Sequence, residues 1–403
     1  MTSDVSSELP VFPMPRACPY APPAAYEDFR AEGKVARVLD REGKPGWLTT
    51  DHEVARQMLG HSAASKNILR PGFPALFMAQ PQLAKETKGF LIWMDPPEHT
   101  LYRHMLAGEF TVRRVKQMRP HIQALADECV DRLLDGPRPA DLVHGFALPY
   151  TSLMISELLG VPYADRELFQ RCTTAILSHE SSEQDRKDAF GEVRALLGGI
   201  VELREKEPAD DLISTMIRKY READVYDRDH LVGMSVMLLG AGHETTANMV
   251  ALGVMTLLDH PEQLAEVTAD PELAPKAVEE LLRYLSIGDQ VTCRVATEDI
   301  EIAGALIKEG EGLISPNAAA NRDPAVFADP ETFDIHRNAR PHLAFGYGIH
   351  QCLGQHLART ELEIAYTTLF RRLPGLRLDV PAQQLEFKAN ALFYGLLELP
   401  VTW

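Results

Sequence analysis

Apolar residues recur at helical spacing through most of residues 98–260. Residues three or four positions apart share one face of a helix, so this spacing predicts helices that each bury one face. One such apolar face is formed by Ile122, Leu125, Ala126, Cys129 and Leu133. Further helices are predicted over about 275–285 and 353–373.

Strand-like patterns are confined to a few short segments. The sequence predicts strands at 35–39 and 46–49, more strands within 290–313 with Gly304 at a turn, and short strands at the end. Residues 314–350 are predicted to be mostly loop. Strands and helices do not alternate as a doubly wound parallel sheet requires. The predicted fold class is therefore mainly α with a minor β portion.

Two stretches are too irregular for either pattern. Residues 1–25 are rich in proline, which disfavours a regular helix, so we expect an extended lead-in on the surface. Residues 60–98 contain several prolines and glycines but are strongly apolar. Long apolar loops inside a compact domain are usually functional, so this loop either caps a site or packs on the core.

The net charge of −17 argues against bulk affinity for nucleic acid. A local basic run still occurs, and it is either a solvated helix face or a docking patch. Its members are Arg103, Arg113, Arg114, Lys116 and Arg119.

The five cysteines are widely spaced and include no C-x-x-C, which argues against a disulfide framework or a zinc site. A reducing compartment fits best. The polar N-terminus lacks the pattern of a signal peptide, and the apolar stretch 231–242 is too short to span a bilayer. We therefore expect a cytoplasmic protein without a membrane anchor.

One of these cysteines lies in an unusual loop, where Phe345, three glycines and His350 surround Cys352 just before a predicted helix. A helix N-terminus stabilises a thiolate, which is the form that binds metal. The loop lacks the third glycine of a dinucleotide-binding turn because Gln351 stands there. A catalytic cysteine assisted by His350 and a cysteine that merely packs in the core are the other readings.

A second unusual segment runs from Leu239 to Thr246, in a predicted helix that is apolar nearly all round. Such a helix is buried, so its Glu244 and Thr245 need a reason to be there. A zinc-protease motif is excluded because Ala247 replaces the second histidine. A structural alternative is that Thr245 donates a hydrogen bond back to a helix carbonyl.

Residues 345–354 match the haem-binding signature F-G-x-G-x-H-x-C-x-G at every fixed position, so the chain resembles the cytochrome P-450 family. The resemblance covers about residues 10–403. In detail the chain is similar to actinobacterial P-450s that tailor polyketides and other secondary metabolites or attack xenobiotics. It implies one mainly helical domain, here 26–403, after the lead-in of 1–25.

The resemblance also implies a set of cofactor-binding residues. Cys352 would be the axial ligand of the iron of haem b, within a loop that includes Phe345, Gly346, His350 and Gly354. Ala241 and Gly242 would leave room for dioxygen, while Thr245 and Glu244 would be the catalytic pair that delivers protons. The haem propionates would be bound by His99, Arg103, Arg294 and His350.

Two further groups of residues follow from the same resemblance. Glu280 and Arg283 would form a buried structural ion pair, with Arg337 or His336 as third partner because Thr332 carries no charge. The loop 70–94 would cap a mostly apolar pocket that suits a bulky hydrophobic substrate. The pocket residues would be Met78, Met94, Met237, Ala241, Gln290, Val291, Leu392 and Phe393.

The implied function is a monooxygenase that inserts one atom of O₂, by hydroxylation or epoxidation, into a secondary metabolite such as a polyketide or macrolide. The sequence contains no NAD or flavin motif, so we expect electrons from a ferredoxin and a ferredoxin reductase, with the basic run as the docking patch. We expect a monomer. Alternatives are non-hydroxylating oxidation on the same fold (ring closure, aryl coupling or peroxide-driven turnover) and a haem sensor or electron carrier.

Overall fold

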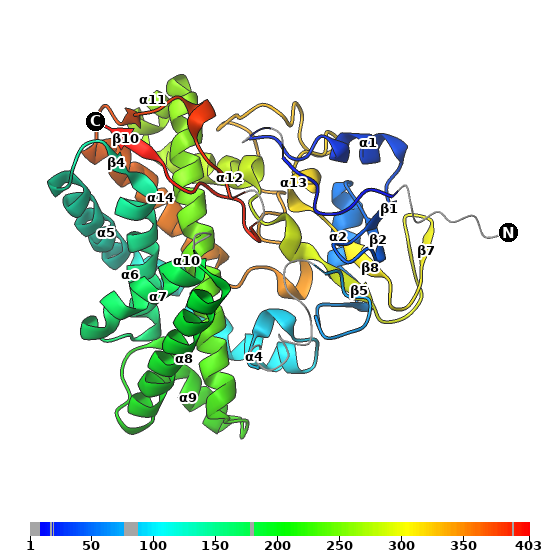
Figure 1. Cartoon of the computed structure of the whole chain (residues 1–403), viewed down its shortest axis with the longest axis horizontal. Coiled ribbons are helices and arrows are strands. Elements are labelled where there is room, and N and C mark those ends of the chain that lie inside the picture. Colours follow the sequence, from blue (N-terminus) through cyan, green and yellow to red (C-terminus); the bar gives the residue numbers. More distant parts are fainter. Residues whose placement is uncertain (1–8, 17, 19, 76–87, 178–180, 389–390) are drawn as a thin grey trace.

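In the computed structural model, a large helical part lies beside a smaller part that contains the main sheet (Figure 1). The structure describes residues 9–16, 18, 20–75, 88–177, 181–388 and 391–403. The fold is mainly α with a minor β portion, as the sequence predicts. Within these residues no helix is both long and apolar enough to cross a membrane.

The predicted helical half of the chain is confirmed. It contains α4 (Glu98–Ala107), α5 (Val112–Asp135), α6 (Leu148–Leu159), α7 (Arg166–Leu177), α8 (Glu183–Lys206), α9 (Leu212–Glu222) and α10 (Arg228–Asp259). Outside it lie α1 (Ala25–Glu32), α2 (His52–Gly60), α11 (Pro261–Ala269), α12 (Ala274–Leu285), α13 (Asn317–Ala320) and α14 (Gln355–Arg372). Helix α13 falls in a region that the sequence predicts to be mostly loop.

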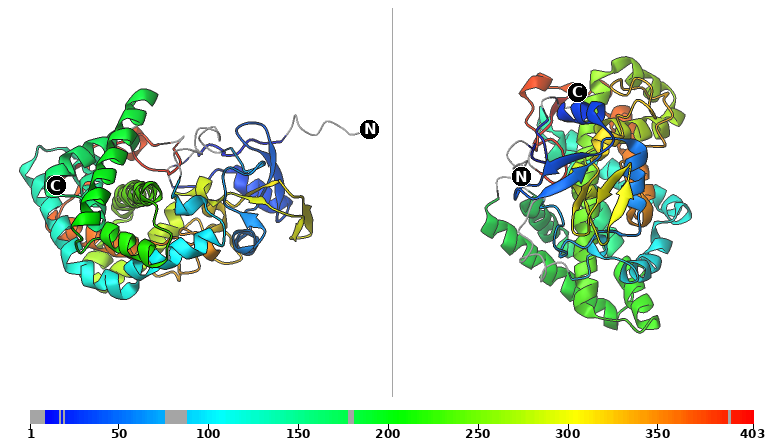
Figure 2. Two further views of the ribbon diagram at one scale, coloured as in Figure 1. Left: turned by 90° about the horizontal axis from the view of Figure 1, so that it is seen from below. Right: turned by 90° about the vertical axis from the view of Figure 1, so that its right-hand side faces the viewer.

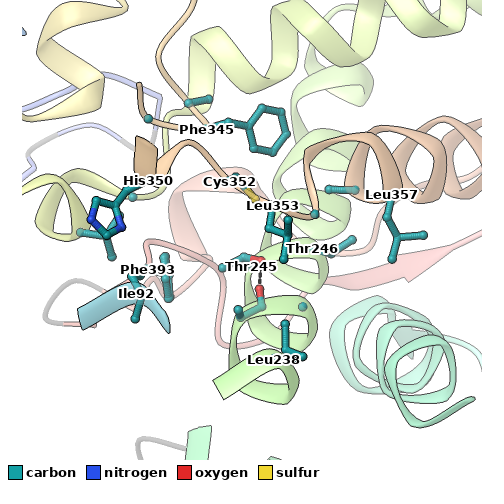
Figure 3. A pocket seen from close by; sticks show the side chains of 18 of the residues that line it. Ile92, Leu238, Thr245, Thr246, Phe345, His350, Cys352, Leu353, Leu357 and Phe393 are labelled. Atoms are coloured by element: carbon teal, nitrogen blue, oxygen red, sulfur yellow. Dashed lines mark hydrogen bonds between the residues drawn. The ribbon is translucent and has the colours of Figure 1, made fainter. Parts of the chain in front are cut away.

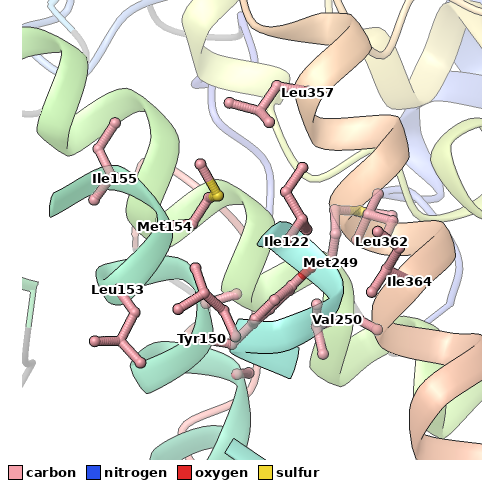
Figure 4. Packing of buried hydrophobic residues seen from close by; sticks show 14 of the residues in the cluster. Ile122, Tyr150, Leu153, Met154, Ile155, Met249, Val250, Leu357, Leu362 and Ile364 are labelled. Carbon is pink, nitrogen blue, oxygen red and sulfur yellow. The ribbon is translucent and has the colours of Figure 1, made fainter. Parts of the chain in front are cut away.

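Helix α10 runs through the middle of the helical part, where it packs against α6, α8, α12 and α14. Figure 2 shows it end-on, ringed by other helices. Apolar side chains of α6, α10 and α14 meet in one core (Figure 4). Helix α14 approaches α10 closely at Gly253, where a Cβ would lie 2.0 Å from the Tyr366 hydroxyl. That hydroxyl donates to the Met249 carbonyl at 2.6 Å, so α14 is held at a defined position against α10.

The main sheet has the strand order β1 (Ala36–Leu39), β2 (Pro45–Leu48), β8 (Gly312–Ile314), β5 (Arg294–Ala296) and β3 (Ala64–Ser65). Strands β2 and β8 are parallel, and the other neighbours are antiparallel. The predicted strands near 35–39 and 46–49 are confirmed. Strands β6 (Ile300–Ile302) and β7 (Ala305–Ile307) form a hairpin that turns at Gly304, with φ of +80°.

The remaining elements are short. Strands β4 (Ala140–Asp141), β10 (Pro400–Thr402) and β9 (Arg377–Leu378) form a second small sheet. Near the start, the Phe12 N–H donates to the Leu39 carbonyl at 2.7 Å, and the Phe12 ring is buried in the core beside the main sheet. Helix α14 begins at Gln355, two residues later than predicted, because residues 353 and 354 still belong to the loop that carries Cys352.

Candidate active site

A cavity of about 290 Å³ lies between the Cys352 loop and α10. Cys352 and Phe345 line it from one side, and Thr245 of α10 lines it from the other (Figure 3). Most of the remaining lining is apolar and comes from α6, α10, α14 and the 287–292 segment. The two unusual segments of the sequence therefore face each other across one cavity.

Glycines and one backbone hydrogen bond shape the Cys352 loop. The Cys352 N–H donates to the Phe345 carbonyl at 2.8 Å, which closes the loop. Gly346 and Gly348 have φ of +69° and +74°, a region that other residues rarely adopt. A Cβ on Gly348 would lie 2.9 Å from the Leu59 carbonyl, so glycine also lets the loop pack against α2.

The Cys352 thiol has a pKa above its usual value in the protein alone, because burial raises it. The Gly354 N–H, Arg103 and Arg359 act in the opposite direction but do not outweigh burial. The sequence-based expectation that a helix end stabilises the thiolate is therefore too simple. A thiolate at this position needs a cation in the cavity, and a metal ion supplies that charge.

On the α10 side, Ala241, Gly242 and Thr245 all line the cavity. The Thr245 hydroxyl donates to the Ala241 carbonyl at 2.7 Å, which is the hydrogen bond of the structural alternative. The same hydroxyl faces the cavity (Figure 3). Because its only proton is used within the helix, Thr245 offers the cavity an acceptor rather than a donor.

Glu244 is buried behind Thr245 and forms an ion pair that the sequence does not predict. The Lys388 Nζ lies 3.3 Å from a Glu244 carboxylate oxygen and 3.0 Å from the Asn248 side-chain oxygen. Lys388 is itself buried, in the segment before the last strand. No local pattern could have revealed this pair, because the two residues are far apart in the sequence.

Glu361 of α14 is a second carboxyl that the sequence analysis missed. It is buried, it lines the cavity, and burial raises its pKa to about 8 despite a hydrogen bond from Thr246. Such a group holds a proton near neutral pH. A carboxylate on the apolar face of an amphipathic helix is the sequence signal that could have identified it.

The four basic residues expected at the propionates all line the cavity. His99 and Arg294 are only 1% and 3% exposed, and the rings of His99 and His350 lie 4.1 Å apart. Arg103 donates to the Gln351 carbonyl at 2.5 Å. Burial lowers the pKa of His99 to about 4 and that of Arg294 to about 10.

Several polar atoms of this cluster lack a partner among the described residues. They are both ring nitrogens of His99 and the Nε of Arg294. Buried polar groups are almost always hydrogen-bonded, so these atoms indicate a bound anionic group. A Cβ on Gly346 or Gly354 would meet no atom within 4 Å, which leaves room for a flat ring beside the loop. The Cys352 sulfur, the open space beside Gly346 and Gly354, and the nearby basic side chains together fit a haem with its two propionates.

The predicted substrate residues divide into three groups. Met237, Ala241, Val291 and Phe393 line the cavity. Met94, Gln290 and Leu392 are not among its described lining residues, because Met94 packs into the main core and the Gln290 amide donates to the Ala391 carbonyl at 3.0 Å. Met78 lies outside the described residues. The sequence analysis did not single out Ile155 and Leu158 of α6, which also line the cavity.

Glu280 and Arg283 lie away from the cavity and are fully buried. Two Arg283 nitrogens each donate to a Glu280 carboxylate oxygen at 2.7 Å. Arg337 is the third partner, with its Nε 3.3 Å from Glu280, whereas His336 pairs with Glu266. Thr332 contributes its carbonyl, which accepts from Arg283 at 3.2 Å.

The basic run is divided by the fold. Arg103 points toward the Cys352 loop and lines the cavity, so it is not part of an outer patch. Arg113, Lys116 and Arg119 are exposed on α5, which packs against α14. Arg114 lies near the carboxylates of Glu109 and Asp210, which partly neutralise the positive potential that it presents at the surface.

Comparisons with known proteins agree with this geometry. A sequence model of the family described as Cytochrome P450 matches residues 168–390. Pentalenic acid synthase of Streptomyces avermitilis is 46% identical over 97% of this chain and 97% of that protein. Vitamin D3 dihydroxylase of Streptomyces griseolus is 44% identical over 100% of this chain and 99% of that protein.

Among solved structures, the crystal structure of cytochrome P450 MoxA from Nonomuraea recticatena is similar with a TM-score of 0.93. Its sequence is 48% identical, and the match covers 97% of this chain and 98% of that one. The chain therefore belongs to the cytochrome P450 family, as a haem-dependent monooxygenase of the actinobacterial type with the single-domain fold of that family.

Proposed function

We propose that this monooxygenase inserts one oxygen atom of O₂ into a bulky apolar small molecule, by hydroxylation or epoxidation. The observation that carries the proposal is the apolar cavity that has Cys352 on one wall and Thr245 on the opposite wall. A haem sensor or electron carrier needs no hydroxyl and carboxyl on the helix that faces Cys352, here Thr245 and Glu244 of α10, so this arrangement favours catalysis.

In this proposal Cys352 binds the haem iron, and His99, Arg103, Arg294 and His350 bind the propionates. When bound, haem would supply the activation of dioxygen, so that O₂, two electrons and two protons would give one oxygen atom for the substrate and one molecule of water. The protein positions the ring: the loop glycines leave it space, and the unpartnered nitrogens of His99 and Arg294 are placed to donate to carboxylates.

The chain's own groups would manage the protons. Thr245 accepts hydrogen bonds from the cavity because its proton is held by the Ala241 carbonyl. Glu244 supplies a carboxyl group next to it in the helix, and the ion pair with Lys388 orients that group. Proton transfer by a positioned side chain typically accelerates a step by about 10²–10⁴-fold.

The substrate is proposed to be a secondary metabolite such as a polyketide or macrolide. Met237, Ala241, Val291 and Phe393 present an apolar surface, and few polar side chains interrupt it. The names of two relatives, pentalenic acid synthase and vitamin D3 dihydroxylase, each refer to a small organic molecule, and the second also refers to hydroxylation. A spectral-shift screen of a metabolite library against the purified protein would identify the compound class.

Electrons are proposed to come from a ferredoxin and its reductase, because the sequence has no motif for NAD or flavin. Arg113 and Lys116 are exposed on α5 beside α14, the helix that follows Cys352, and form a cationic site for an acidic partner. Reversing both to Glu should slow reduction by ferredoxin and weaken its salt dependence. Unchanged rates and salt dependence would disprove this docking site. Cytoplasmic location and a monomeric state stay predictions.

Two experiments test the proposal. The carbon monoxide difference spectrum should show a thiolate-type band for the wild-type protein, and Cys352→Ser should abolish it; a band that persists would reject Cys352 as ligand. Turnover with ferredoxin and reductase should yield hydroxylated or epoxidised product, and Thr245→Val should lower the product formed per electron. Turnover with peroxide alone, or ring closure and aryl coupling as the main outcome, would instead favour non-hydroxylating chemistry.

A further inference from the structure

Lys66 is a buried cation that directly follows β3 and lines the same cavity. The residue is only 1% exposed. Its Nζ donates to the Val291 carbonyl at 2.6 Å and to the Cys293 carbonyl at 3.2 Å. It also lies 4.9 Å from the centre of the Trp93 ring, so its surroundings are mostly apolar. Neither the haem signature nor the substrate pattern of the sequence includes this residue.

No carboxylate pairs with the Lys66 ammonium among the residues that the structure describes. The nearby Asp95 is used otherwise: it accepts from the Ser65 hydroxyl at 2.5 Å and from the Lys66 backbone N–H at 2.9 Å. Neutral carbonyls only partly replace the water that a buried ammonium loses. A buried charge without a counter-charge is strongly destabilising, so Lys66 needs either an anion or the loss of its proton.

A second buried cation, Arg294, lies close to Lys66 and increases the energetic cost of leaving the Lys66 ammonium without an anion. The Arg294 Nη1 donates at 2.9 Å to the same Cys293 carbonyl that accepts from Lys66. Two basic side chains therefore share one neutral acceptor, and the Arg294 Nε has no partner in the described part of the chain. Burial, and next the charge of Arg294, lower the pKa of Lys66 well below its usual value in the protein alone. An anion placed between the two groups would reverse both effects.

We propose that Lys66 is a fifth basic residue of the haem site and that its ammonium neutralises a porphyrin propionate together with Arg294. The inference rests on the proposed placement of the haem against Cys352 and adds a residue to it. Because Lys66 also holds the carbonyls of Val291 and Cys293, it joins the propionate to the wall on which the substrate lies.

The proposal predicts a charge effect on the iron in addition to an effect on haem retention. A positive charge near the ring favours the reduced iron, so its removal should move the reduction potential to a more negative value. Loss of a hydrogen bond to a buried charged group should accelerate haem release by about tenfold or more. A purely structural lysine would shift neither quantity when it is replaced by a neutral side chain that keeps its two hydrogen bonds to the carbonyls.

The test compares Lys66→Met with the wild-type holoenzyme in the absence of substrate. Haem transfer to an excess of an apo-haem acceptor protein and the reduction potential are measured, and the carbon monoxide spectrum reports thiolate ligation. We expect faster transfer and a more negative potential with the thiolate band retained. Lys388→Met is the matched control, because Lys388 is equally a buried lysine but pairs with Glu244, so its haem transfer should stay within about twofold of wild type.

Lys66→Gln separates charge from structure, since the amide can still donate to the two carbonyls. It should keep the wall intact and still shift the potential. If Lys66→Met fails to fold, this variant carries the test alone. A wild-type potential and a wild-type transfer rate in Lys66→Gln would overturn the proposal, because they would leave Lys66 only a structural role.

Haem whose propionates are blocked as methyl esters identifies the anion. With this haem, the difference in transfer rate between the wild-type protein and Lys66→Met should disappear, whereas a difference that persists would show that another group is the partner and overturn the proposal. Failure of the proposed function has a separate signature, namely a wild-type protein without a thiolate band.

Discussion

Two buried arginines in this protein, Arg283 and Arg294, differ in how many of their hydrogen-bond donors have a partner. Arg283 makes two bonds to Glu280 and donates to the carbonyls of Asn321, Pro330 and Thr332. Arg294 donates only to the carbonyl of Cys293, and its Nε has no described partner. Both residues are nearly inaccessible to solvent.

This difference separates a structural cation from one that is placed for a ligand. A buried group whose donors are all used has nothing left to offer, so its role is to hold the fold. A buried group with unused donors is unfavourable in the protein alone and becomes favourable only when an anion arrives. Burial by itself therefore does not distinguish the two roles, whereas the state of the donors does.

The largest expected effect on the free energy of unfolding is at Arg283, the arginine whose partners lie within the protein. Arg283→Met would leave the buried Glu280 carboxylate with only the Asp334 N–H at 3.0 Å and the longer contact to Arg337 at 3.3 Å, so the free energy of unfolding should fall by about 3–5 kcal/mol. Urea denaturation followed by circular dichroism measures this. Arg337→Met is the control and should cost clearly less, because Glu280 keeps both bonds to Arg283. Equal losses of stability in Arg283→Met and Arg337→Met would show that Arg283 is not the main partner of Glu280.

The Glu279 carboxylate, which is paired with His342 and Arg359, should show a pH-dependent effect on stability. Burial tends to raise the pKa of Glu279, but hydrogen bonds from His342 and Arg359 outweigh it and lower the pKa from 4.5 to about 2. A lowered carboxyl pKa contributes stability that is present above pH 4.5 and lost as the pH falls toward 2.

Glu279→Gln should therefore lower the free energy of unfolding by roughly 2–3 kcal/mol at pH 7 and have little effect near pH 2. Urea denaturation across this pH range is the measurement. A cost that is the same at both ends of the range would contradict the assigned pKa.

At Arg294, which has no counter-charge paired with it among the described residues, substitution should affect the retention of haem rather than the stability of the haem-free protein. Arg294→Met removes a buried cation without a counter-charge, so the haem-free protein should unfold at an equal or higher urea concentration. Haem transfer to an acceptor protein should become about tenfold faster. A haem-free variant that is clearly less stable than wild type would place Arg294 with Arg283 as a structural cation.

The smallest effect is expected at the Lys388–Glu244 pair. This lysine has a paired counter-charge, which Arg294 lacks in the described part of the chain, but makes fewer hydrogen bonds than Arg283. A double-mutant cycle of Lys388→Met and Glu244→Gln should give a coupling energy of about 1 kcal/mol in urea unfolding, because the two groups are buried and in contact. Lys388→Met alone should also slow product formation, since Glu244 would lose its counter-charge. Additive single costs would show that the two residues act independently.

The candidate catalytic centre could be proposed from the sequence because its chemistry is concentrated in short segments. Phe345 to Gly354 carries the glycines, the cysteine and a histidine in a spacing that few other sites require. Thr245 and Glu244 attract attention because polar residues are rare in a buried helix. The pairing of Glu280 with Arg283 is also local, since positions three apart share one helix face.

Other partners depend on contacts between distant segments. Arg337 rather than His336 became the third partner because the loop before Cys352 turns Arg337 inward. Gln290 was expected in the pocket, but its amide is held by the Ala391 carbonyl. Lys66 and Lys388 follow no local pattern, and only packing places them at the cavity and against Glu244.

The sequence by itself therefore determined the family, the cofactor, the expected iron ligand and the helical class, because hydrophobic periodicity and a spaced motif are local properties of the chain. Only the tertiary structure decided which buried charges are neutralised within the protein and which are left without a partner. The physical reason is that desolvation depends on the side chains that surround a charge, and these come from segments far apart in the sequence.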